Sequence, residues 1–157
     1  MGRFSILILT IGIPGSGKST WTKEYQKQHP LTYIVSTDAI REELMGTRRV
    51  DDASKSPMIH EEARKRVKQI LDDPNSQGGL GPEIIVDSTN VDVEEWAAYR
   101  KLNPSIMLAK VFDISVSEAM ERQNERGFIV PQEVVQWKYD SLQKYKPYMQ
   151  FFFNMIL

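Results

Sequence analysis

The chain has 157 residues, of which 41% are hydrophobic and 26% are charged, and its formal net charge is −1. These values are ordinary for one globular domain, so they exclude a disordered or membrane class, and the near-neutral charge excludes a broad basic surface for nucleic acid. The chain has no cysteine, which excludes disulfides, thiolate metal sites and cysteine nucleophiles. We therefore expect a single domain over residues 1–157, located in the cytoplasm, with no membrane contact and no stable protein partner.

Apolar runs rich in β-branched residues alternate with helical patterns along the chain. The expected strands are Ile6–Ile11, Tyr33–Val35, Ile84–Val86 and Ile106–Phe112. The expected helices are Lys18–Gln28, Asp38–Met45, Met58–Leu71, Val93–Leu102, Val116–Arg126 and Pro131–Lys144, with loops over Gly46–Ser56 and Asp72–Pro82. This alternation predicts an α/β sandwich of three layers with a mostly parallel central sheet. Ser115 and Glu118 form a capping box for the fifth helix, and Gly127 is expected to stop it.

The segment from Gly12 to Ser19, Gly-Ile-Pro-Gly-Ser-Gly-Lys-Ser, follows the first strand and opens the first helix. This order is typical of a phosphate-binding loop, in which glycines bring backbone N–H groups close to phosphate oxygens and the helix dipole favours the anion. Lys18 is expected to reach the β- and γ-phosphates, and Ser19 to bind Mg²⁺. The nucleotide-binding residues predicted here are Gly12, Gly15, Ser16, Gly17, Lys18, Ser19 and Thr20.

Polar residues directly after the next two strands are candidates for the chemistry, because ligands of open α/β sheets gather at the carboxyl ends of the strands. Asp38 is interpreted either as a general base for an acceptor hydroxyl or as a helix cap. Arg41, three residues on, either positions an acceptor phosphate or lies on the surface near Asp38 or Glu42. Asp87 occupies the position of a Walker-B-like aspartate, with a simple strand-end turn as the alternative.

Arg122 and Arg126 lie four residues apart near the end of the fifth helix. Like charges at this spacing repel, so either a nucleotide phosphate lies between them or the glutamates of the same helix neutralise them. In the first case this helix belongs to a lid, around residues 116–131, whose arginine stabilises the transferring phosphoryl group. The basic residues Arg64, Lys65, Arg66 and Lys68 are interpreted mainly as a solvated helix face, and the apolar C-terminus is expected to pack on the domain.

These motifs together resemble the 5′-kinase domain of bacteriophage polynucleotide kinase. The resemblance rests on residues 12–21, Asp38 with Arg41, and residues 86–90, 111–113 and 122–127, which appear in the family's order and spacing. It implies a P-loop NTPase fold with a helical lid, and transfer of the γ-phosphate of ATP to a 5′-hydroxyl of DNA or RNA with Mg²⁺. It further implies catalytic roles for Lys18, Asp38, Arg41, Asp87 and Arg126, nucleotide contacts from Arg122 and Arg126, and Mg²⁺ coordination by Ser19.

Two departures from the family pattern are visible. The sequence reads Thr37-Asp38-Ala39 where phage enzymes tend to have Arg-Asp-Asp, and no Asp-x-Asp-Gly-Thr run follows, so we expect no attached 3′-phosphatase. The leading interpretation is a polynucleotide kinase that acts on 5′-hydroxyl ends of single-stranded or nicked nucleic acid in repair, plausibly encoded by a phage. A small-metabolite kinase on the same scaffold, or a nucleotide-dependent switch without acceptor chemistry, are the alternatives. The guanine-reading Asn-Lys-x-Asp motif is absent, which favours ATP over GTP.

Overall fold

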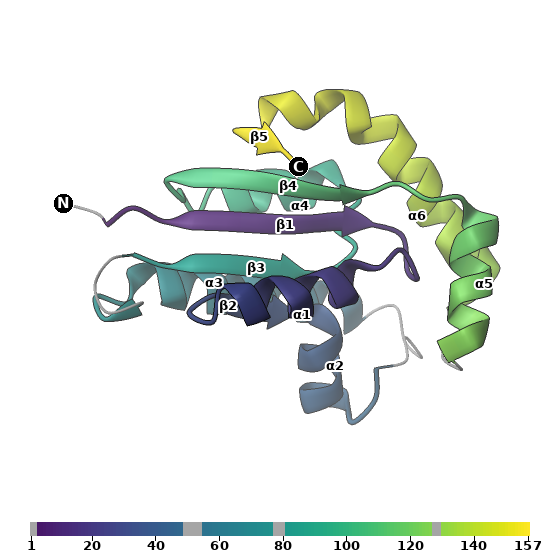
Figure 1. Ribbon diagram of the computed structural model, residues 1–157, viewed down its shortest axis with the longest axis horizontal. Helices are drawn as coiled ribbons and strands as arrows, with labels where there is room; N and C mark the ends of the chain where they lie inside the picture. The colour runs from purple at the N-terminus through teal and green to yellow at the C-terminus, as the bar shows by residue number, and fades with distance from the viewer. Residues whose placement is uncertain (1–2, 49–54, 77–80, 127–129) are drawn as a thin grey trace.

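The computed structural model describes residues 3–48, 55–76, 81–126 and 130–157. Its centre is a five-stranded parallel sheet with the order β2-β3-β1-β4-β5 (Figure 1). The strands are β1 (Ile6–Gly12), β2 (Tyr33–Ser36), β3 (Glu83–Asp87), β4 (Ile106–Phe112) and β5 (Met155–Ile156). The near-continuous apolar sequence of β1 and β3 is what a strand covered on both faces requires.

Helices cover both faces of this sheet and the end at which its strands terminate. The helix α1 (Lys18–Gln28) lies on one face, and α3 (Ser56–Asp72) and α4 (Val93–Arg100) lie on the other (Figure 1). The helix α2 (Thr37–Met45) and the pair α5 (Val116–Arg126) and α6 (Gln132–Tyr145) stand at the carboxyl ends of the strands. This arrangement confirms the predicted α/β sandwich of three layers with a parallel central sheet.

Two apolar clusters stabilise the fold. The main core lies between the sheet and α3, α4 and α6, and includes Trp96, which is fully buried. A smaller cluster joins Ile13 of the phosphate loop to Ala119 of α5 and Val135 of α6. The helices α5 and α6 therefore share a core with the segment between β1 and α1, and this core fixes their position beside that segment.

The predicted elements are all present, with shifts of one or two residues at several ends. Ser115 Oγ accepts a hydrogen bond from the Glu118 amide at 3.1 Å, as its cap assignment predicts. The described residues do not include Gly127, the expected stop of α5. They also leave out parts of the predicted lid and of both predicted loops. Among those described, no helix is long and apolar enough to cross a membrane.

The C-terminal segment packs on the domain as expected, but its form was not predicted. A 3₁₀ helix, η3 (Lys146–Phe151), leads to β5, and Phe152 and Phe153 pack edge-on against Trp96. Asn154 fixes this segment, because its backbone N–H donates to the Met107 carbonyl at 2.8 Å. A two-residue strand has too little pattern to be recognised from sequence alone.

Candidate active site

The phosphate loop joins β1 to α1, and its backbone requires glycine at three points. Gly15 and Gly17 have φ angles of +86° and +99°, in the left-handed region where other residues are strained. A Cβ at Gly12 would lie 2.6 Å from Ser16 Oγ, and one at Gly15 would lie 2.6 Å from the Ala119 carbonyl oxygen. The loop therefore packs tightly against itself and against α5, and α1 begins directly after it.

Lys18 lies at the first position of α1 with its ammonium group enclosed. Its Nζ donates to the Ile13 carbonyl at 2.7 Å and contacts Ser16 Oγ at 3.3 Å. Burial lowers the pKa of Lys18 to about 7, although the carboxylates of Asp87 and Asp38 act to raise it. A buried cation that the protein only partly compensates is a suitable partner for an incoming phosphate.

Ser19, on the first turn of α1, is in direct contact with Asp87 at the end of β3. Ser19 Oγ donates to Asp87 Oδ2 at 2.9 Å. Burial raises the pKa of Asp87, while this hydrogen bond and the Lys18 charge lower it. A hydroxyl and a carboxylate oxygen are hard ligands of the kind that Mg²⁺ uses alongside phosphates and water. The described residues contain no cluster of three His, Cys, Asp or Glu that would hold a metal without such help.

Asp38 lies on the first turn of α2, and the structure removes one of its two interpretations. The cap of this helix is Ser36, whose Oγ accepts from the Ala39 amide at 3.2 Å. Asp38 is therefore not the cap of α2. Its exposed carboxylate is close enough to Lys18 and Asp87 to raise the pKa of each. This position suits a proton acceptor at the edge of the phosphate site.

Arg41 is buried rather than on the surface, which contradicts the alternative of a surface arginine. Arg41 is in the middle of α2, and its buried side chain reaches α3, where Nη2 approaches Ser56 Oγ at 3.5 Å. The buried Nε has no hydrogen-bond partner in the structure. Leaving such a donor unsatisfied is costly, so an anion entering here would gain a ready guanidinium partner.

The two arginines of α5 have different surroundings. Arg122 is paired with Glu118 at 2.8 Å, as the neutralisation interpretation predicted, and its Nη1 also donates to the Ser16 carbonyl at 3.3 Å. Arg126 is close enough to Lys18 to lower its pKa, after the larger effect of burial. The structure thus brings both arginines of α5 near the loop between β1 and α1. Thr20, another predicted contact, lies exposed on α1.

A family model for the AAA domain matches residues 7–145, which is most of the chain. The chain belongs to the AAA_33 family. This family consists of P-loop kinase domains that generally bind ATP with Mg²⁺, and the closed glycine loop, the buried Lys18 and the Ser19–Asp87 contact fit both groups.

Three solved structures are similar to this chain in fold. A chain of the Pnkp1/Rnl/Hen1 RNA repair complex is 22% identical, with a TM-score of 0.77 over 94% of this chain and 47% of that chain. A second structure of the Pnkp1/Rnl/Hen1 complex is 23% identical, with a TM-score of 0.62 over 78% of this chain and 40% of that one. A gluconokinase from Sinorhizobium meliloti 1021 is 19% identical, with a TM-score of 0.59 over 89% and 76%. The AAA_33 chain thus spans about half the length of the repair-complex chains that it matches.

Lys138 of α6, which the sequence-based prediction did not include, also lies close to Lys18 and Asp38. Its Nζ donates to Thr89 Oγ1 at 3.0 Å, in the loop that follows β3. The sequence does contain a signal for this lysine, because Lys138 lies three residues after Val135 and four before Leu142. Both of those residues are buried on the inner face of α6, and a lysine at this spacing interrupts an apolar stripe.

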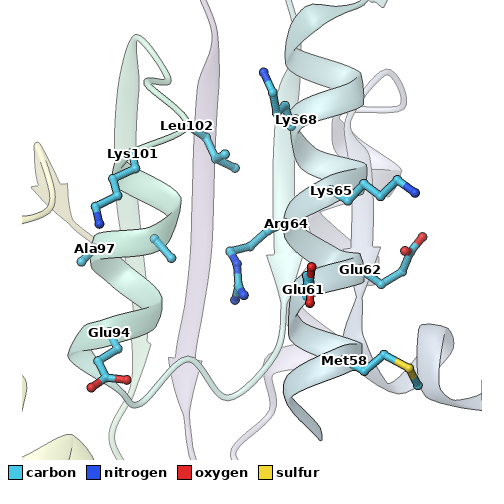
Figure 2. Close-up of a pocket in the computed structure, with 11 residues that line it drawn as sticks. Met58, Glu61, Glu62, Arg64, Lys65, Lys68, Glu94, Ala97, Lys101 and Leu102 are labelled. Atoms are coloured by element: carbon cyan, nitrogen blue, oxygen red, sulfur yellow. The ribbon is translucent and has the colours of Figure 1, made fainter. Parts of the chain in front are cut away.

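A groove of about 810 Å³ between α3 and α4 is separate from these residues (Figure 2). Its charged lining is mixed, with Arg64, Lys65, Lys68 and Lys101 opposed by Glu61, Glu62 and Glu94. Arg64 reaches toward α4 in Figure 2 and pairs with Glu95 at 3.0 Å. The basic residues of α3 are largely neutralised in this way, which favours the interpretation of that helix as a solvated face.

Proposed function

We propose that the chain is an ATP-dependent polynucleotide 5′-hydroxyl kinase that acts on DNA or RNA ends. The observation that carries the proposal is the position of Asp38 close to Lys18, together with the buried, incompletely bonded Arg41 one turn further along the same helix. A carboxylate and a guanidinium next to a γ-phosphate site suit an acceptor that brings both a hydroxyl and an anion. The similarity to a chain of an RNA repair complex over 94% of this sequence supports a nucleic-acid acceptor.

In the proposed reaction the acceptor hydroxyl oxygen forms a bond to the γ-phosphorus while the bond to the β–γ bridging oxygen breaks. Asp38 takes the hydroxyl proton, and ADP leaves with the bridging oxygen. Lys18 and Arg126 compensate the negative charge on the transferring group, and Arg41 orients the acceptor through its phosphate. Bound Mg²⁺, held by Ser19 with Asp87 nearby, would neutralise charge on the β- and γ-phosphates.

A small-metabolite kinase is the second candidate, because the same fold occurs in a gluconokinase and the net charge of −1 gives no general attraction to nucleic acid. The deciding experiment incubates the protein with γ-labelled ATP and Mg²⁺. The acceptors are 5′-hydroxyl DNA and RNA oligonucleotides, and gluconate in a parallel reaction. Label on an oligonucleotide supports the proposal, and label only on gluconate contradicts it. ATP binding without transfer to any acceptor would indicate a switch.

The assigned roles are tested by two variants in the same assay. Asp38→Asn removes the proton acceptor and is expected to lower kcat about a hundredfold or more. Arg126→Ala removes charge compensation in the transition state, with an expected loss of about a thousandfold. Glu42→Gln on α2 and Arg100→Ala on α4 are the matched controls, since Glu42 pairs with Arg48 and Arg100 bonds Asn154 away from the site. Near-normal turnover in both test variants would show that these assignments are wrong.

A further inference from the structure

Lys138 is fixed between the phosphate loop and the acceptor side of the site. Its partner Thr89 also accepts a hydrogen bond through its carbonyl oxygen from the Gly12 amide at 3.0 Å, at the start of the phosphate loop. Ser141, three residues later on α6, donates to the Val91 carbonyl at 2.9 Å. Residues three apart lie on one helix face, so α6 is attached to the β3–α4 loop at two successive points. These contacts consequently position the Lys138 ammonium group next to Thr89.

The charges around Lys138 show what it faces. Burial lowers the pKa of Lys138; Asp38 acts to raise it and Arg41 to lower it, so both site residues of α2 are close. Burial is the main cause of the lowered pKa of both Lys18 and His60, and Lys138 acts in the same direction on each. Glu95 acts to raise the pKa of His60. The lysine is therefore near the phosphate loop, through Thr89, and near Arg41.

Positive charge at this position exceeds what the protein supplies to balance it. Lys138 is close to Lys18 and to Arg41, and Asp38 is close to both lysines. Asp87 is close to Lys18, and the buried Nε of Arg41 has no hydrogen-bond partner. Thr89 gives Lys138 one neutral acceptor, although an ammonium group has three protons to donate. Clustered, incompletely bonded cations in a partly buried site are stabilised when an anion enters.

We propose that Lys138 shares with Arg41 the binding of an acceptor phosphate, and that Lys138 thereby determines the preference for acceptors with a phosphate next to the reacting hydroxyl. The inference rests on the proposed kinase function and adds a residue from the lid hairpin to the acceptor contacts. In a nucleic-acid end, the relevant anion is the first internucleotide phosphodiester. One cation would come from α2 and the other from α6, so a bound acceptor would bridge the two helices.

The test uses a pair of 5′-hydroxyl oligonucleotides that differ at one linkage. In one the first internucleotide linkage is a phosphodiester, and in the other it is an uncharged methylphosphonate of nearly the same shape. Transfer of label from ATP is measured for wild type, Lys138→Met and Lys138→Arg, with Lys144→Met as the control for an exposed lysine on the same helix. The urea midpoint of each variant establishes that it is folded.

We expect Lys138→Met to lower kcat/KM for the phosphodiester roughly ten- to a hundredfold, as loss of a charge-assisted hydrogen bond implies. Its effect on the methylphosphonate is expected to stay within about twofold, and Lys138→Arg should retain most of the activity, since it keeps the charge. An equal loss on both acceptors would overturn the proposal, because it would indicate a structural role. A rise in the KM for ATP with an unchanged acceptor preference would also overturn it, because Lys138 would then serve the nucleotide.

A binding measurement separates this inference from the proposed function. Adenosine 3′-monophosphate, which carries a 5′-hydroxyl and one phosphate, is titrated into wild type and Lys138→Met in the presence of ADP and Mg²⁺. If no oligonucleotide is labelled but binding weakens at least tenfold in the variant, the kinase assignment fails and the anion contact stands. If oligonucleotides are labelled and this probe binds both proteins equally or neither, the Lys138 inference fails alone.

Discussion

Replacing Lys18 by methionine tests how strongly the burial of its ammonium group destabilises the folded protein. The ammonium group has a pKa of about 7 in the folded protein, against 10.5 as its ordinary value. The unfolded chain therefore binds more protons than the folded protein between these pH values, so the free energy of unfolding of the wild type rises with pH over that range. Integrated over the shift, the penalty for charged Lys18 is about 4 kcal/mol at pH 7 and about 2 kcal/mol at pH 9.

Lys18→Met removes this penalty and also loses the hydrogen bonds to Ile13 and Ser16, which are worth about 1 kcal/mol each. We expect the nucleotide-free variant to be about 2 kcal/mol more stable than wild type at pH 7 and nearly equal at pH 9, on these same magnitudes. The measurement is urea unfolding of both proteins at each pH. Lys23→Met, which alters an exposed lysine of the same helix, is the control. A wild-type-to-variant difference that does not change between pH 7 and pH 9 would refute the reasoning.

Two further predictions concern the base of the lid. Gly15→Ala is expected to destabilise the protein by about 1–3 kcal/mol and to weaken ATP binding, because the new Cβ would lie against the Ala119 carbonyl at a φ of +86°. Gly46→Ala has a similar φ of +75° but open space, so an equal loss of urea stability in both variants would show that the contact with α5 is unimportant. Ser115→Ala removes the cap of α5 and should lower the free energy of unfolding by about 1 kcal/mol; an unchanged thermal midpoint would contradict the role of this cap.

The phosphate loop and the order of strands and helices were predictable because they depend on local pattern. Glycines at fixed spacing, a buried strand and a helix-compatible run specify the loop within a dozen residues, and the Ser115 cap was equally local. The assignment of Asp38 was ambiguous for the same reason. Aspartate and serine are both good caps, and only the Ser36 contact in the structure shows which of them caps α2.

Features that depend on contacts between distant segments were not predictable. The burial of Arg41 follows from α3 packing over α2, and the place of Lys138 follows from α6 lying on the β3–α4 loop, 49 residues from Thr89 in sequence. Strand β5 forms because Asn154 and Leu157 bond to β4, and nothing in the apolar C-terminal run distinguishes that outcome from simple packing. Such contacts leave only weak signals in a single sequence, such as the lysine that interrupts the inner face of α6.

The interior of the sheet also determines the distance between the loop after β1 and the loop after β3. The pairing of β1 with β3 ends at Leu9 and Val86, and beyond it the Thr10 hydroxyl donates to the Ser88 carbonyl at 2.9 Å. The Asn90 amide group donates to the Thr10 carbonyl, also at 2.9 Å. These hydrogen bonds hold the ends of β1 and β3 together, so the distance between the loop after β1 and the loop after β3 is fixed inside the sheet. Evolution of a new acceptor preference in such a scaffold would therefore proceed through the surrounding helices, with the spacing inside the sheet left unchanged.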